Sequence, residues 1–203
     1  MKKNIPNILT LFRIILIPAF ILFFYLPFVW KPLITAAIFG IAALTDWLDG
    51  YLARRLDQTS AFGAFLDPVA DKLMVVVALV LLVGGHGTPW LAIPAAIIIG
   101  REIVVSALRE WMAELGQRAT VAVAKVGKFK TIFQMVAIFI MLLGEPASEP
   151  LIWYPDSFLA NLPFFAHIIY TIGFALLYVA ASLTLWSMVI YLHAARDDVI
   201  GDK

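Results

Sequence analysis

Long apolar runs are the feature that most constrains the fold of this chain. Of its 203 residues, 63% are hydrophobic and 14% are charged, and the mean hydropathy is +0.94. A water-soluble domain of this length could not bury so much apolar surface. The runs are close to the ~20 residues that cross a bilayer, and short polar breaks separate them. We therefore expect an all-α, polytopic membrane protein.

The polar breaks divide the chain into six expected membrane spans. Asp67 and Pro68 are expected to begin the third helix, as its N-cap and its first-turn residue. No internal repeat or low-complexity tract interrupts the pattern, so residues 1–203 are expected to form a single domain. The expected spans are about 8–29, 33–52 (with its helix continuing to Leu56), 67–83, 90–115, 126–143 and 164–191.

Basic residues indicate the orientation of these spans. With the N-terminus inside, the inner side receives the 53–66 loop, the 109–130 segment and the C-terminal tail. Of the fifteen Lys and Arg residues, only Lys31 falls in a segment assigned to the outside, and the outer loop 144–163 contains acids but no base. The positive-inside rule then places both termini in the cytoplasm. We expect the protein to lie in the cytoplasmic (inner) membrane.

The first apolar run could also be taken for a signal peptide, because it follows Met-Lys-Lys. It carries Arg13 and Pro18 and lacks a small-residue cleavage site. We therefore expect it to be retained as the first span. Arg13 lies within that span, so it says little about orientation.

Four carboxylates stand in two helix-spaced pairs. Asp46 and Asp49 are three residues apart, and Asp67 and Asp71 are four apart, so on helices each pair shares one face. Both pairs lie where apolar helices end or begin, and we expect them to face each other at a membrane boundary. Four acids there repel one another unless cations lie between them. Oxygen ligands favour Mg²⁺, Mn²⁺ or Ca²⁺ over zinc, and two divalent ions roughly 3.5–4 Å apart are a known device for displacement at phosphorus.

The same stretch resembles a family signature. It reads D-x-x-D-G-x-x-A-R-x8-G-x-x-x-D-x-x-x-D, and this is similar without a departure to the signature of the CDP-alcohol phosphatidyltransferase family. Eight positions with fixed gaps make the resemblance specific. The alternative is two capped helix ends with solvated acids, although acids within a membrane are costly and usually functional. The matching positions are Asp46, Asp49, Gly50, Ala53, Arg54, Gly63, Asp67 and Asp71.

The resemblance implies transfer of a phosphatidyl group from CDP-diacylglycerol to an alcohol, with release of CMP, by a homodimer. Asp71 is the expected general base on the acceptor hydroxyl. The two glycines could instead serve helix packing, and Arg54 could be a cation that extends to the membrane surface. The expected ligands of two Mg²⁺ or Mn²⁺ ions are Asp46, Asp49, Asp67 and Asp71, and the expected CDP-diacylglycerol contacts are Gly50, Ala53, Arg54 and Gly63.

Basic residues gather near the middle of the chain. Arg101 lies well inside the fourth span beside Glu102, and a buried Arg normally has an anionic partner. Arg109, eight residues later, projects from nearly the same helix face. Lys128 and Lys130 begin the fifth span. We expect these four cations to bind a phosphorylated acceptor. The alternative is contact with anionic lipids.

Further segments narrow the expected acceptor. NIPNILTLFRI, GREI with Ser106, GKFKT with Gln134, and LTLWSM resemble the bacterial family members that use sn-glycerol 3-phosphate and form phosphatidylglycerophosphate. The net charge of +1 gives no reason to expect a nucleic-acid partner. One alternative is a family member with another acceptor, of the cardiolipin or phosphatidylinositol-phosphate type. The other alternative is a divalent-metal transporter. Transporters often show repeats with broken helices, and this sequence shows no internal repeat.

Overall fold

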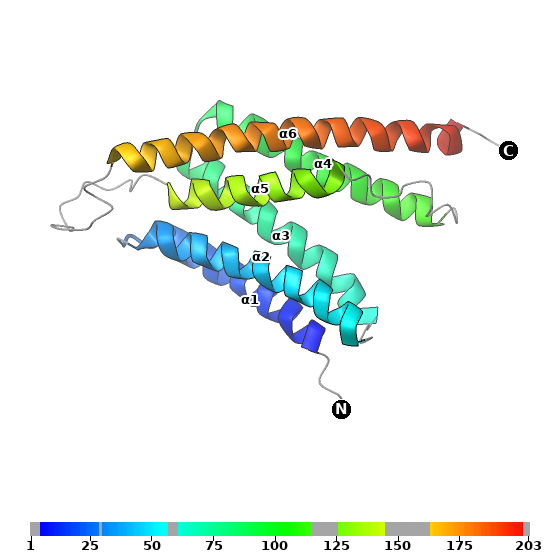
Figure 1. Ribbon diagram of the computed structural model, residues 1–203, viewed down its shortest axis with the longest axis horizontal. Coiled ribbons are helices and arrows are strands. Elements are labelled where there is room, and N and C mark those ends of the chain that lie inside the picture. Colours follow the sequence, from blue (N-terminus) through cyan, green and yellow to red (C-terminus); the bar gives the residue numbers. More distant parts are fainter. Residues whose placement is uncertain (1–4, 29, 57–60, 115–125, 145–162, 201–203) are drawn as a thin grey trace.

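Six helices form within the residues that the computed structural model describes, which are 5–28, 30–56, 61–114, 126–144 and 163–200. No strand occurs in these ranges. The helices are α1 (Ile5–Tyr25), α2 (Lys31–Leu56), α3 (Ala61–His86), α4 (Pro89–Glu114), α5 (Val126–Leu143) and α6 (Pro163–Ile200) (Figure 1). The all-α expectation is confirmed for this part of the chain.

Each expected span corresponds to one helix, and the largest differences lie in α3 and α6. The predicted start of α3 is wrong, because the helix begins at Ala61 and Asp67 is not its N-cap. The apolar and small residues of 61–66 continue the helix, so Pro68 lies within it instead of opening it. α6 also extends to Ile200, well beyond its expected end.

The helices alternate in direction, and this brings the polar segments to one end of the bundle. α1 packs against α2, α5 packs against α6, and α3 crosses between the two pairs (Figure 1). The first turns of α1, α3 and α5 therefore lie at the same end as the last turns of α2, α4 and α6. We call this the polar end, since it holds residues 46–56, 61–72, 101–114 and 126–130 of α2 to α5.

The outer surface of the bundle is apolar. Ile15, Leu22, Val80 and Ile103 are each more than half exposed, as are many other large hydrophobic side chains. Contact of such a surface with lipid chains is favourable, whereas its contact with water is unfavourable. Four helices contain segments long and apolar enough to span a membrane, namely Ile8–Tyr25, Val69–His86, Pro89–Met112 and His167–Ile190.

α2 and α5 have shorter apolar stretches than the other four helices. In α2 the uncharged stretch lies between Lys31 and Asp46, and the apolar segment found within the described residues of α5 is Lys130–Leu143. A bilayer core needs about 20 apolar residues, so these two helices fall below the length of an ordinary span. The structure thus supports a multi-pass membrane protein, while the number of six spans and the cytoplasmic termini stay predictions.

Apolar packing away from the polar end fixes the helices relative to one another. Side chains from all six helices form one continuous buried cluster, including Phe20, Phe39, Leu79 and Ile138. α5 approaches its neighbours closely, because a Cβ atom at Gly173 of α6 would lie 2.7 Å from Met141 Cγ. Small residues allow such close approach between helices in membranes. This core determines where the charged side chains of the polar end meet.

Candidate active site

The acidic part of the site begins with a buried ion pair between α1 and α2. Arg13 Nη1 lies 2.9 Å from Asp46 Oδ1. The Arg13 side chain is 1% exposed, whereas that of Asp46 is 43% exposed. The two groups are close but are not aligned as a hydrogen bond, and Nε, Nη1 and Nη2 of Arg13 have no hydrogen-bond partner among the described residues. Asp46 is thus held by charge and stays accessible.

Asp71 lies on α3, half-buried, near the same ion pair. Its carboxylate is within electrostatic range of Asp46, Arg13, Glu102 and Lys72. Asp46 of the first predicted acid pair therefore lies on α2, and Asp71 of the second pair lies on α3. The sequence-based expectation that the two pairs face each other is supported for Asp46 and Asp71.

The other predicted ligands and donor contacts are placed only by their backbone. Asp49, Gly50, Ala53 and Arg54 lie in the last turns of α2, and Asp67 lies early in α3, but their side chains are outside the described part of the structure. Gly63, also in α3, is buried. Within the side chains that the structure describes, no three acidic or histidine groups come together as a metal site would require. The four-carboxylate metal site stays a prediction, and its oxygen ligands fit Mg²⁺ or Mn²⁺.

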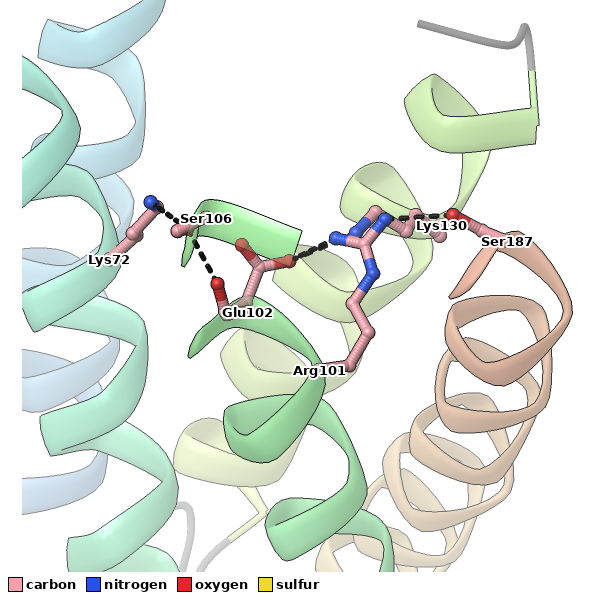
Figure 2. Close-up of polar contacts among 6 residues, drawn as sticks. All are labelled: Lys72, Arg101, Glu102, Ser106, Lys130 and Ser187. Atoms are coloured by element: carbon pink, nitrogen blue, oxygen red, sulfur yellow. Dashed lines mark hydrogen bonds and ion pairs between the residues drawn. The ribbon is translucent and has the colours of Figure 1, made fainter. Parts of the chain in front are cut away.

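A second charged cluster centres on the Glu102 carboxylate. Arg101 Nη1 donates a hydrogen bond of 2.6 Å to Glu102 Oε1, and Lys130 Nζ donates one of 2.9 Å to the same oxygen (Figure 2). Arg101 and Lys130 are about 95% buried, and the Glu102 side chain is 25% exposed. Two buried cations from α4 and α5 thus share one partly exposed anion.

Serine hydroxyls extend this cluster to α3 and α6. Arg101 Nη2 donates to Ser187 Oγ at 2.7 Å, which ties α4 to α6. Ser106 Oγ donates to the Glu102 main-chain carbonyl at 2.6 Å, and it accepts a hydrogen bond from Lys72 Nζ of α3 (Figure 2). A hydroxyl can donate once and still accept, so both contacts of Ser106 are compatible.

The structure brings together two of the four cations predicted to bind a phosphorylated acceptor. Arg101 and Lys130 meet at Glu102, and the anionic partner expected for a buried Arg101 is confirmed. Arg109 lies on α4 and Lys128 on α5, both near the polar end, but their side chains are outside the described residues. Phosphate binding by these cations stays a prediction.

A small pocket connects the acidic and basic clusters. Its volume is about 50 Å³, and Asp71 and Glu102 both line it. Polar and apolar side chains of α3, α4 and α5 line it together. A molecule in this pocket would meet Asp71 and Glu102, and Glu102 is the carboxylate that Arg101 and Lys130 share. The lining residues are Asp71, Lys72, Val75, Val76, Ile98, Ile99, Glu102, Thr131, Gln134 and Met135.

Comparison with known proteins decides the family. The family model described as CDP-alcohol phosphatidyltransferase matches residues 3–195. The chain belongs to this family. A relative from Pectobacterium atrosepticum, called CDP-diacylglycerol–glycerol-3-phosphate 3-phosphatidyltransferase, is 54% identical over 98% of this chain and 99% of its own. Relatives with the same name from Salmonella typhimurium (52% identical) and Yersinia pestis (54% identical) have the same coverage.

Two cations of this family member were given no role by sequence reasoning. From the sequence, Arg13 is considered only as a residue within a span. The rule that a buried Arg has an anionic partner, which predicts a partner for Arg101, applies equally to Arg13. Applied to Arg13, that rule would have predicted an acidic partner. Lys72 directly follows Asp71, and nothing in the sequence indicates that Ser106 is its partner. That contact depends on how α3 and α4 pack.

The Glu102 cluster yields a prediction about stability. Glu102→Gln keeps the shape of the side chain but leaves Arg101 and Lys130 buried without their anion. Breaking buried ion pairs costs about 3–5 kcal/mol, and we expect a loss near the lower end because Glu102 is partly exposed. Thermal unfolding of the purified protein in detergent would measure this loss. Glu110→Gln, at an exposed position of the same helix, is the matched control and should change stability by less than about 0.5 kcal/mol. Equal midpoints for the two variants would contradict the account.

Proposed function

We propose that this protein transfers the phosphatidyl group of CDP-diacylglycerol to sn-glycerol 3-phosphate, giving phosphatidylglycerophosphate and CMP. The observation that carries the proposal is the 52–54% identity, over nearly the whole of both chains, to relatives named for this reaction. The site is compatible with that chemistry, because one pocket is lined by Asp71 and by Glu102, the carboxylate that Arg101 and Lys130 share.

The acidic cluster suits the nucleotide-activated donor. Asp46, Asp49, Asp67 and Asp71 are the proposed ligands of two Mg²⁺ or Mn²⁺ ions. When bound, these ions would neutralise the diphosphate and the charge that develops on the CMP leaving group. The residues proposed to contact CDP-diacylglycerol are Gly50, Ala53, Arg54 and Gly63, on the two helices that carry the acids.

Asp71 is the proposed general base. The acceptor hydroxyl would attack the phosphorus of the phosphatidyl group, the bond from that phosphorus to the bridging oxygen of the diphosphate would break, and CMP would leave with that oxygen. The proton of the hydroxyl would pass to Asp71. A carboxylate is a weak base, but it suffices when the hydroxyl is positioned and the site is polarised. The place of Asp71 in the pocket wall agrees with this role.

The basic cluster suits the phosphate of the acceptor. Arg101, Arg109, Lys128 and Lys130 are the proposed ligands. Glu102 neutralises Arg101 and Lys130 in the substrate-free site, and it is exposed enough for an incoming phosphate to share those cations. Glycerol 3-phosphate would then span the pocket, with its phosphate at this cluster and its hydroxyl at Asp71. A phosphorylated acceptor fits these charges better than serine or choline does.

The membrane arrangement follows from the same assignment. We propose six spans with both termini and the polar end in the cytoplasm, where nucleotide-activated lipid and glycerol 3-phosphate would be found. The polar ends of α2 and α5, the two helices with short apolar stretches, would lie near the inner surface. The acyl chains of the donor would stay in the bilayer, and the protein would act as a homodimer.

The metal requirement is tested by CMP release. Purified protein in detergent, given CDP-diacylglycerol and glycerol 3-phosphate, should release CMP with Mg²⁺ or Mn²⁺, because the clustered carboxylates repel the diphosphate without them. Chelator in excess should abolish release. Glycerol, serine or inositol 1-phosphate in place of glycerol 3-phosphate should support little release. Full activity in chelator would refute the metal site, and faster release with another acceptor would refute the assignment of glycerol 3-phosphate.

The acceptor assignment is tested at Lys130. Charge-assisted hydrogen bonds contribute roughly 1.5–3 kcal/mol, which corresponds to about 10- to 150-fold in affinity. Lys130→Gln should therefore raise the KM for glycerol 3-phosphate on that order. The KM for CDP-diacylglycerol is the internal control and should change little, since Lys130 belongs to the Glu102 cluster proposed for the acceptor. Steady-state kinetics with each substrate varied in turn would decide. A change confined to CDP-diacylglycerol would assign the basic cluster to the donor.

A further inference from the structure

Arg13 is a buried cation that makes no side-chain hydrogen bond to the described residues. Its side chain is 1% exposed, and its Nη1 atom lies 2.9 Å from Asp46 Oδ1. Nevertheless, Nε, Nη1 and Nη2 have no hydrogen-bond partner among the residues that the structure describes. A guanidinium carries five N–H donors, and leaving buried donors unpaired is costly. The side chain is thus held by charge, with its donors available to another acceptor.

The position of Arg13 makes a purely structural role a poor explanation. It lies inside the candidate span Ile8–Tyr25, where a charge is expensive and usually functional. α1 and α2 already pack through apolar residues such as Phe20 and Phe39, so an ion pair is not needed to join them. A structural ion pair would also gain most from aligned hydrogen bonds. At Arg13 the charges are close, but no hydrogen bond to the described part of the chain accompanies them.

The charges around Arg13 indicate what kind of ligand would use its donors. Asp46 lies 2.9 Å from it, Asp71 is within electrostatic range, and both belong to the proposed metal site. A cation next to those carboxylates opposes metal binding in the free enzyme. The same cation favours binding once an anion enters the site together with the metals. Two adjacent phosphate groups are such an anion, and the planar guanidinium matches phosphate oxygens with two parallel N–H donors.

We propose that Arg13 is a diphosphate-binding residue of the donor site, using its unpartnered N–H groups to bind phosphate oxygens of a nucleoside diphosphate. This inference rests on the proposed use of CDP-diacylglycerol as donor. In the empty site, Asp46 holds the guanidinium in place. In the complex, Arg13 binds the diphosphate from α1, in addition to the contacts proposed for α2 and α3. It also stabilises the charge left on CMP when the bond to the transferred phosphorus breaks.

The test is nucleotide binding by the full-length protein in detergent. CDP carries the diphosphate without the lipid, and its affinity can be measured by calorimetry at saturating Mn²⁺. Arg13→Gln should weaken CDP binding by about 10- to 150-fold, the range for losing a charge-assisted contact. Arg13→Lys should recover only part of the loss, because it keeps the charge but not the two-pronged geometry. Lys31→Gln, a cation at the opposite end of α2, is the control and should bind CDP normally.

Two further titrations separate phosphate binding from positioning of Asp46. Mn²⁺ binding without nucleotide, followed by electron paramagnetic resonance, should be unchanged or tighter in Arg13→Gln, because a cation beside the ligands has been removed. Weaker Mn²⁺ binding by the same factor as CDP binding would mean that Arg13 acts through Asp46, and this would overturn the proposal. Glycerol 3-phosphate affinity should not change. A loss there with normal CDP binding would also overturn it.

The remaining outcomes are also decisive. If Arg13→Gln does not fold, as judged by its thermal midpoint, the intermediate CDP affinity of Arg13→Lys carries the test, and wild-type affinity in that variant would refute the proposal. Failure of the proposed function looks different, because the wild-type protein would then release no CMP from CDP-diacylglycerol with any acceptor. Wild-type turnover combined with normal CDP binding by Arg13→Gln would refute the role of Arg13 alone.

Discussion

Charge inside an apolar helical bundle must be paired, and several polar contacts of the described residues join one helix to another. Arg13 on α1 meets Asp46 on α2, and Lys130 on α5 meets Glu102 on α4. Arg101 on α4 reaches Ser187 on α6. Removing one partner would leave a buried charge uncompensated, which is far more costly than losing an exposed ion pair. These contacts therefore fix the polar end of the bundle and at the same time form the candidate site.

The division of each helix into an apolar part and a polar part explains how the site is built. The apolar parts pack into one continuous core with close helix contacts, such as that of Gly173 with Met141. Because the helices alternate in direction, their polar parts gather at one end (Figure 1). Asp46 of α2 and Asp71 of α3 then lie near each other, and Asp71 lines a pocket together with Glu102 of the Arg101–Glu102–Lys130 cluster. The two clusters suit the diphosphate and the phosphorylated alcohol of the proposed reaction.

Much of this arrangement could be predicted from the sequence, and the physical reasons differ from part to part. The helices follow from apolar runs of membrane length, so α5 has its expected bounds. The Arg101–Glu102 pair follows from adjacency in an apolar span. The start of α3 was missed, because Asp67-Pro68 is a local signal that the apolar residues of 61–66 override. The Arg13–Asp46 and Lys72–Ser106 contacts depend on the packing of different helices, and no spacing along the chain encodes that packing.

Donor and acceptor are proposed to bind at the same time, the donor at Asp46 and Asp71 and the acceptor at the Arg101–Glu102–Lys130 cluster. The most direct measurement is the initial rate of CMP formation with both substrates varied. Direct transfer in a ternary complex predicts double-reciprocal lines that intersect, and no release of CMP before the acceptor binds. Parallel lines, together with CMP release in the absence of acceptor, would reveal a phosphatidyl-enzyme intermediate and would contradict the account.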